Sequence, residues 1–201
     1  MHILHVDSSI LGDHSVSQQI SGEIVARLAG EGDTVIERDL GRTPLPHLDL
    51  SNLPSAHPLA QQEGIAAPDR AEGDAVLREF LEADVVVVGA PMYNFGISSQ
   101  LKAWVDRILV PGTTFRYGAN GPEGLAGGKR VVVAAARGGF YGQGAPAASF
   151  EHMESYLRTV FAFIGITDLE VIVAEGLSGG AEQRASAVAR ASAAARELKA
   201  A

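Results

Sequence analysis

Uninterrupted apolar runs alternate with amphipathic stretches along the whole chain. The two clearest runs are residues 85–90 and 131–135, which are rich in Val and Ala and show no alternation of apolar and polar positions. Such runs are typical of strands buried on both faces, as in a parallel sheet that helices cover. We therefore predict a buried strand at each of these two segments.

The remaining pattern predicts three more strands and the helices between them. Strands are expected at residues 3–6, 34–37 and 168–174. Apolar positions three and four residues apart predict helices, which we place around residues 20–28, 76–81, 101–109, 153–164 and 181–198. Strands that alternate with helices favour an α/β fold, here a doubly wound five-stranded parallel sheet with helices on both faces, in one domain spanning residues 1–201.

Three segments lack a regular period. Residues 43–68 are rich in Pro, and we expect a long excursion over the surface with a short helix around residues 60–65. Residues 113–128 and 138–144 are rich in Gly and are predicted to be loops.

Composition excludes several classes of protein. The 201 residues contain no Cys, so disulfides, thiolate metal sites and a Cys nucleophile are excluded, and any redox chemistry requires a bound cofactor. The formal charge of −8 disfavours a nucleic-acid partner. Because no apolar run approaches a membrane span and no signal peptide is recognisable, we expect a cytoplasmic protein. The six histidines show no spacing typical of a metal site, so no metal is predicted.

Ligands of doubly wound sheets bind outside the carboxyl ends of the strands, so the loops after the first, third and fourth strands are the candidates. In the first loop the hydroxyls of Ser9, Ser15 and Ser17, together with free amides at a helix N-terminus, could hold a phosphate. The alternative is that Ser15 only caps the helix.

The other two loops suggest a flat ring. Met92, Tyr93 and Phe95 follow the strand at residues 85–90, where they could form the apolar wall that a flavin requires rather than pack in the core. In the fourth loop Gly138 and Gly139 would let the backbone approach a ligand, although a simple Gly-rich turn remains the alternative.

These residues also carry a family resemblance. Residues 91–102, PMYNFGISSQLK, closely resemble the signature of the FMN-dependent NADH-azoreductase family, a flavodoxin-like group also described as NADH:quinone oxidoreductases. The likeness continues at residues 114–117, 120–125, 137–139 and 163–168, so it covers essentially the whole chain.

The resemblance implies a tightly bound FMN and a homodimer with two active sites at the subunit interface. The implied FMN contacts are Ser9, Ser15, Val16 and Ser17 at the phosphate, Met92, Tyr93, Asn94 and Phe95 at the isoalloxazine, and Ala136, Arg137, Gly138 and Gly139 at its polar edge. Tyr117 and Phe161 are implied on the substrate side. Val16 and Ala136 stand where members of the family often carry a polar side chain. Because alanine has no polar atom in its side chain, an FMN contact from the side chain at position 136 is excluded.

The activity implied is two-electron transfer by a ping-pong mechanism, from NADH or NADPH to a quinone or an azo compound. The scarcity of Lys near the expected site favours NADH. A flavodoxin-type electron carrier and a regulator without cofactor remain as alternatives. Residues 43–68 and 113–128 favour the enzyme, because they could build a second pocket over the flavin.

Overall fold

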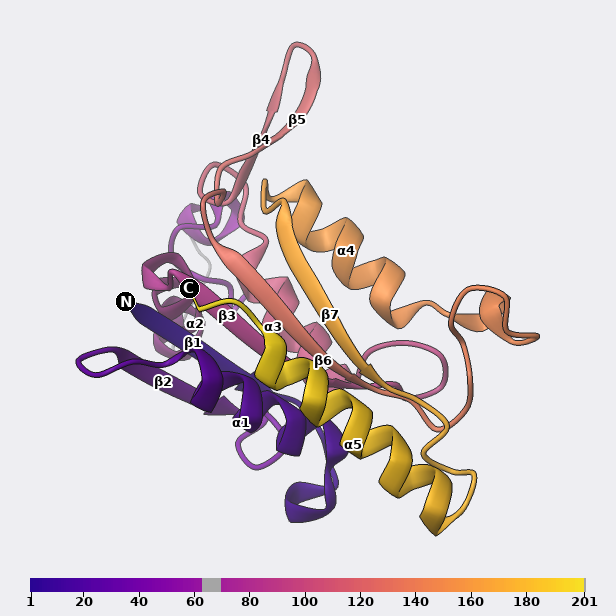
Figure 1. Cartoon of the computed structure of the whole chain (residues 1–201). Coiled ribbons are helices and arrows are strands. Elements are labelled where there is room, and N and C mark those ends of the chain that lie inside the picture. The colour runs from indigo at the N-terminus through magenta and orange to yellow at the C-terminus, as the bar shows by residue number, and fades with distance from the viewer. Residues whose placement is uncertain (63–69, 201) are drawn as a thin grey trace.

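The computed structural model describes residues 1–62 and 70–200. Its centre is a parallel sheet of five strands in the order β2-β1-β3-β6-β7 (Figure 1). The strands are β1 (His2–Asp7), β2 (Thr34–Asp39), β3 (Val85–Pro91), β6 (Arg130–Ala136) and β7 (Asp168–Ala174). This arrangement confirms the predicted doubly wound sheet, and each of the five predicted strands is present.

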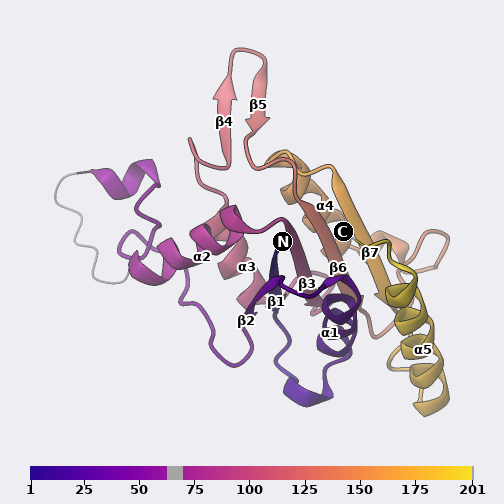
Figure 2. The same ribbon diagram turned by 60° about the vertical axis from the view of Figure 1, so that its left-hand side comes forward.

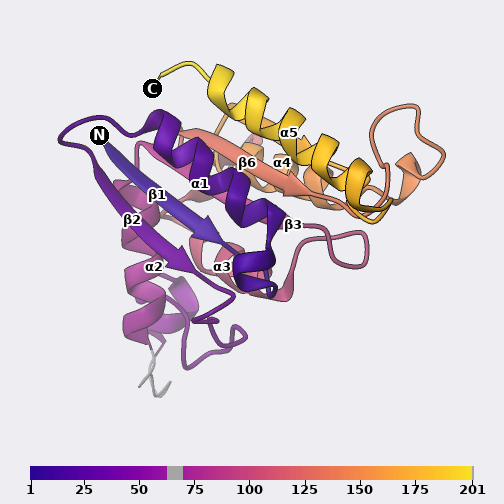
Figure 3. The same cartoon turned by 60° about the horizontal axis from the view of Figure 1, so that its bottom comes forward.

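Helices cover both faces of the sheet. On one face lie α1 (Val16–Leu28) and α5 (Ala181–Glu197), and on the other α2 (Arg70–Glu82), α3 (Ser99–Ile108) and α4 (Met153–Phe163) (Figure 3). Val85 and Val87 of β3 pack with α1 and α5, whereas Val86 and Val88 pack into the core beneath α2, α3 and α4. The uninterrupted apolar run of β3 therefore reflects burial of the strand on both sides.

The larger of the two cores is centred on Trp104 of α3. Its side chain is completely buried and meets the Phe80 ring edge-on, with 5.9 Å between the ring centroids. Trp104 is therefore a core residue of this chain.

The prediction of a loop over residues 113–128 is wrong in part. The segment holds the hairpin of β4 (Phe115–Gly118) and β5 (Gly121–Gly124), which stands apart from the rest of the chain (Figure 2). An ion pair joins Arg116 to Glu123 across the hairpin, with 2.7 Å between Nε and Oε2. At the base, a Cβ on Gly124 would lie 2.1 Å from the backbone nitrogen of Gly165, so only glycine permits this approach.

The Pro-rich excursion contains a 3-10 helix, η2 (Pro58–Gln61), and two further 3-10 turns lie at η1 (Gly12–His14) and η3 (Ala148–Phe150). Of the helix predicted around residues 60–65, residues 60 and 61 belong to η2, whereas residues 63–65 lie outside the described residues. Arg107 of α3, almost fully buried, attaches the start of the excursion to the core by donating from Nη2 to the carbonyl of Pro46 over 3.0 Å. Across residues 1–62 and 70–200, none of the helices has both the length and the apolar character needed to cross a membrane.

Candidate functional site

Two cavities adjoin at the carboxyl edge of the sheet, where the predicted loops meet. The large cleft has a volume of about 1230 Å³ and the small cavity about 220 Å³, and both are lined by Met92 and Tyr93. The loop that follows β3 therefore forms the boundary between a roomy space and a narrow one.

The small cavity lies at the N-terminus of α1. This helix begins at Val16 because the Ser15 side chain caps it, its Oγ accepting a hydrogen bond from the Gln18 amide at 3.2 Å. The first amides of a helix have no acceptor within the helix, so those of Val16 and Ser17 are available to a ligand. Ser15 thus serves as the cap, and the cavity beside it has the hydroxyls and free amides that suit a phosphate.

The other walls of the small cavity come from distant parts of the chain. They are Ser9, Leu11 and His14 before α1, Pro91, Met92 and Tyr93 at the end of β3, Ala136 and Gly138 after β6, and Leu177, Ser178 and Arg184 after β7. Ser9, Ser15, Val16, Ser17, Ala136 and Gly138 therefore lie around one cavity.

Arg184 was missed by the sequence analysis. It lies in the Ala-rich stretch at the end of the chain, where the local pattern showed only a helix. The packing of α5 beside α1 brings it to the small cavity, and no short-range signal contains that information.

The large cleft lies between the β3 loop and the helices α3 and α4. It is lined by Ile10, Met92, Tyr93, Asn94, Gly96, Ile97, Ser98, Ser99, Gln100, Lys102, His152, Ser155, Tyr156 and Thr159. Burial raises the pKa of Tyr156, and Asp106 adds to that effect. The Tyr156 phenol therefore stays protonated at neutral pH and can donate a hydrogen bond into the cleft.

The β3 loop turns sharply at Asn94 and Phe95. Both have positive φ, 47° and 73°, while Tyr93 and Gly96 exchange backbone hydrogen bonds of 3.0 and 3.1 Å. Two successive positive φ values are typical of a type I′ turn, which favours Asn and Gly. The turn leaves the Phe95 side chain 45% exposed at the edge of the sheet, and such strained non-glycine residues are frequent at binding sites.

The residues predicted at the polar edge of the flavin ring differ in their surroundings. The Arg137 side chain lines neither cavity and is buried among three carboxylates, with Nη2 2.6 Å from Glu154 Oε2. Backbone bonds hold the next two residues against the loop after β7: Ser178 N donates to the Gly138 carbonyl, and Gly176 N to that of Gly139. Gly138 lines the small cavity, whereas Gly139 lines neither cavity and lies against the Tyr141 ring.

The structure separates the two residues expected on the substrate side from the cavities. Tyr117 is 75% exposed on the β4–β5 hairpin, which lies at the end of the sheet opposite to the carboxyl ends of the strands (Figure 1). Phe161 is completely buried in the core, so it cannot meet a substrate at the surface of the chain. Among the described residues, none of 43–62 or 113–128 lines either cavity, so within a single chain these segments do not form the expected second pocket.

No group of three or more His, Asp or Glu side chains suited to a metal ion occurs in the part of the chain that the structure describes. Lys129 lines neither of the two cavities. Its Nζ donates hydrogen bonds to the carbonyls of Leu81 and Ala83 at 2.7 Å each. Lys129 therefore pairs with carbonyl groups at the C-terminal end of α2 and not with a phosphate.

Comparison with known proteins places the chain among flavoproteins. A family model described as flavodoxin-like fold matches residues 1–198. The chain is 60% identical to an FMN-dependent NADH:quinone oxidoreductase of Methylorubrum extorquens and 58% identical to FMN-dependent NADH:quinone oxidoreductase 2 of Bradyrhizobium diazoefficiens, each over 203 residues and the full length of both chains.

Solved structures of similar shape have related names. An azoreductase from Bacillus anthracis superposes with a TM-score of 0.82 at 29% identity, covering 98% of this chain and all of that one. An FMN-dependent NADH-azoreductase from the same species, solved in complex with FMN, gives a TM-score of 0.81 at 26% identity, covering 97% of this chain and 98% of the other.

Proposed function

Because the chain belongs to the flavodoxin-like family that includes the FMN-dependent NADH:quinone oxidoreductases, we infer that it is an oxidoreductase that binds FMN and transfers electrons from NADH to a quinone. The observation that carries this inference is the pair of adjoining cavities at the carboxyl edge of the sheet. One offers hydroxyls, backbone amides and Arg184 for a phosphate, the other is a large, partly apolar cleft, and they meet at Met92 and Tyr93.

The residues present fit FMN. The phosphate would be held by the hydroxyls of Ser9, Ser15 and Ser17 and by the amides at the start of α1. Other members of the family often carry a polar side chain at the position of Val16. That side chain is not needed here, because the backbone amide of Val16 would contact the phosphate in its place. Met92, Tyr93, Asn94 and Phe95 would lie along the ring.

At the polar edge of the ring, the backbone of the β6 loop would supply the contacts. Ala136 has no polar side chain, and Arg137 is buried against Glu154 and lines neither cavity, so neither side chain is placed to donate to the ring. The amides of Gly138 and Gly139 are the donors we assign to this edge. Hydrogen bonds there would favour the additional negative charge of a reduced ring.

FMN, when bound, would supply the hydride and two-electron chemistry that links NADH to a quinone or an azo compound. The protein binds and orients the reactants. We propose a ping-pong order because the large cleft beside Met92 and Tyr93 has room for a flat substrate, so that NADH and the acceptor would occupy it in turn. Tyr156 and His152 line that cleft and could hold a proton near the acceptor.

We also propose a homodimer. The large cleft opens between α3 and α4 on one face of the sheet, and the Tyr117 hairpin reaches away from the body of its own chain. A second copy could bring such a hairpin to the cleft, which would place Tyr117 on the substrate side of a partner's site. Sedimentation of the purified protein would show a species of twice the chain mass; a monomer would contradict this part of the proposal.

The redox function is tested on the purified protein by its visible spectrum under anaerobic conditions. NADH should bleach the flavin band, and a quinone added afterwards should restore it. Initial rates at several fixed quinone concentrations should give parallel double-reciprocal lines, and reduction of an azo bond to two amines should consume two NADH. A bound flavin that neither NADH nor NADPH bleaches would overturn the enzyme and leave an electron carrier, and a colourless protein that does not take up FMN would overturn both.

A further inference from the structure

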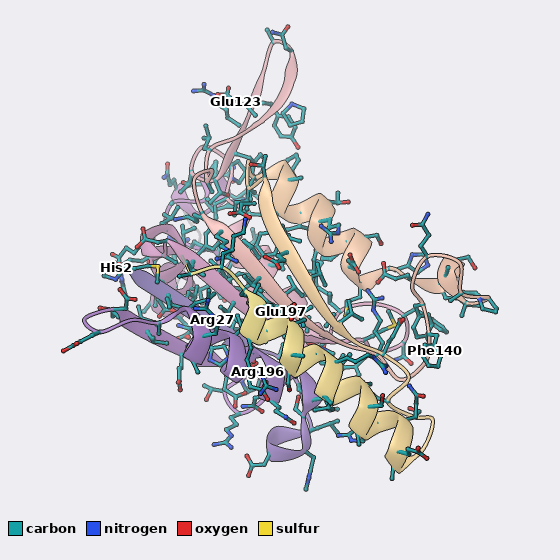
Figure 4. The ribbon with its side chains drawn as sticks, viewed as in Figure 1. His2, Arg27, Glu123, Phe140, Arg196 and Glu197 are labelled. Carbon is teal, nitrogen blue, oxygen red and sulfur yellow. The ribbon has the colours of Figure 1, made fainter. Side chains whose placement is uncertain are left out.

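Helices α1 and α5 run side by side in the same direction over one face of the sheet (Figure 3). Near their C-terminal ends Arg27 Nε donates to the carbonyl of Arg196 over 3.0 Å, and both side chains lie at this junction (Figure 4). At the N-terminal ends, Arg184 Nη2 of α5 donates to the carbonyl of His14, just before α1, over 3.3 Å. The guanidinium of Arg184 is therefore held beside the small cavity.

The charges around the small cavity are unusual for an acidic chain. Its lining includes no Asp or Glu, and Arg184 is the one Arg or Lys among the lining residues. Within residues 1–62 and 70–200, Arg184 forms no ion pair with a carboxylate, although the chain carries a formal charge of −8. Among those residues, no carboxylate therefore competes with a ligand of the small cavity for this guanidinium.

We propose that Arg184 is a specificity-determining residue that completes the phosphate site and makes it select FMN over riboflavin, the same flavin without its phosphate. The inference rests on the proposed function and adds to it a contact from α5. Hydroxyls and amides donate hydrogen bonds but supply no net charge, whereas a phosphate monoester carries about 1.5 to 2 negative charges at neutral pH. Arg184 supplies the charge that the serines lack, and its planar group can donate two bonds to one phosphate.

The position of Arg184 determines how strongly it should raise the affinity for FMN. Its side chain is exposed at the rim of the cavity, so solvent and salt screen its charge in part. A hydrogen bond to a charged group contributes enough for about a tenfold change in affinity at low ionic strength. The contribution should decrease as salt is added, whereas hydrogen bonds from the serines and amides should be less sensitive.

The test measures binding of FMN and of riboflavin to the apoprotein, by quenching of flavin fluorescence, for the wild type, Arg184→Gln and Arg184→Lys. Arg190→Gln is the matched control, because Arg190 is an exposed arginine of the same helix whose Nη1 is bonded to Ser186 Oγ at 2.7 Å. We expect Arg184→Gln to raise the Kd of FMN about tenfold and to leave that of riboflavin within about twofold. Arg184→Lys should retain part of the preference, and Arg190→Gln should change neither Kd.

Two results would overturn the role of Arg184 while leaving the proposed function intact. One is an unchanged FMN Kd in Arg184→Gln. The other is an equal loss of affinity for both flavins, which would mean that Arg184 shapes the site as a whole. If the wild-type apoprotein binds neither flavin, the proposed function itself fails, and the inference fails with it.

Discussion

A Cβ atom on Gly89 would lie 2.1 Å from Oδ1 of Asp7. That carboxylate is buried between β1, β3 and α1, where Oδ1 accepts a hydrogen bond from Ser21 Oγ at 2.7 Å and Oδ2 lies 3.1 Å from His5 Nε2. Gly89 of β3 provides the space for this cluster. The cluster in turn attaches α1 to the sheet below the small cavity.

Gly89→Ala should therefore destabilise the fold. The methyl group would displace a buried carboxylate from its partners, and disruption of a buried polar pair costs about 3 kcal/mol. The free energy of unfolding, measured by urea denaturation, should fall by about that amount.

Gly22→Ala is the matched control for this change. Gly22 lies inside α1, and apart from its chain neighbours and the backbone of its own helix no atom lies within 4 Å of the position its Cβ would take. Alanine in an open helical position stabilises a helix by about 0.5–1 kcal/mol relative to glycine. Equal unfolding free energies for the two variants would contradict the steric account of Gly89.

The second prediction concerns the link between the β1 and β3 loops. Tyr93 Oη lies 3.2 Å from Ser9 Oγ and accepts a hydrogen bond of 3.3 Å from the Ile10 amide. Tyr93→Phe removes both contacts, and we expect the Kd of FMN to rise about three- to tenfold because the two loops are no longer aligned.

A double-mutant cycle isolates this link. Ser9→Ala should also weaken FMN binding, and the combined variant should lose less than the product of the two separate losses. If the two losses multiply instead, Ser9 and Tyr93 contact the ligand independently and the bridge between the loops does not matter for binding.

The third prediction concerns the backbone at Asn94. A left-handed conformation costs most L residues about 1–2 kcal/mol, whereas Asn and Gly adopt it readily. Asn94→Ala should therefore lower the FMN content of the purified protein, while Asn94→Gly should retain most of it. The absorbance ratio of flavin to protein measures both, and similar losses in the two variants would show that the Asn94 side chain, rather than the turn, is what FMN requires.

Much of the fold was predictable because the deciding signals are local. The uninterrupted run at residues 85–90 is apolar because β3 is buried on both faces, and the spacing of Ile20, Ile24 and Leu28 corresponds to the buried side of α1. Loops at the carboxyl ends of such strands are then adjacent by topology alone, so their grouping into one candidate site follows.

The features that sequence missed depend on contacts between distant segments. The β4–β5 hairpin is short and rich in Gly, and its base is fixed by the approach of Gly124 to Gly165, which no local pattern records. Arg184 reaches the small cavity because α5 lies beside α1. The inward orientation of Arg137 likewise depends on Glu151, Glu154 and Glu175 converging on it from two other elements.

The last prediction concerns pH and the carboxylate of Glu151, which lies just before α4. Burial by itself would raise the pKa of Glu151, but hydrogen bonds from the amides of Glu154 and Ser155, the nearby Arg137 and the amide of Met153 outweigh it and lower the pKa below its ordinary value of 4.5. The ionised form is therefore the one that stabilises the fold. Its contribution is complete above pH 4.5 and is lost as the pH falls through the lower pKa of the folded state.

Glu151→Gln removes the charge but keeps an acceptor oxygen at the start of α4. At neutral pH the free energy of unfolding of the variant should be about 1 kcal/mol lower than that of the wild type, which is the usual effect of losing a favourable interaction at a helix N-terminus. Because the wild-type carboxylate becomes protonated in acid, this difference should shrink as the pH is lowered below about 4.5. Urea denaturation of both proteins across that range measures it, and a difference that stays constant down to about pH 3 would mean that the charge of Glu151 does not stabilise this corner of the fold.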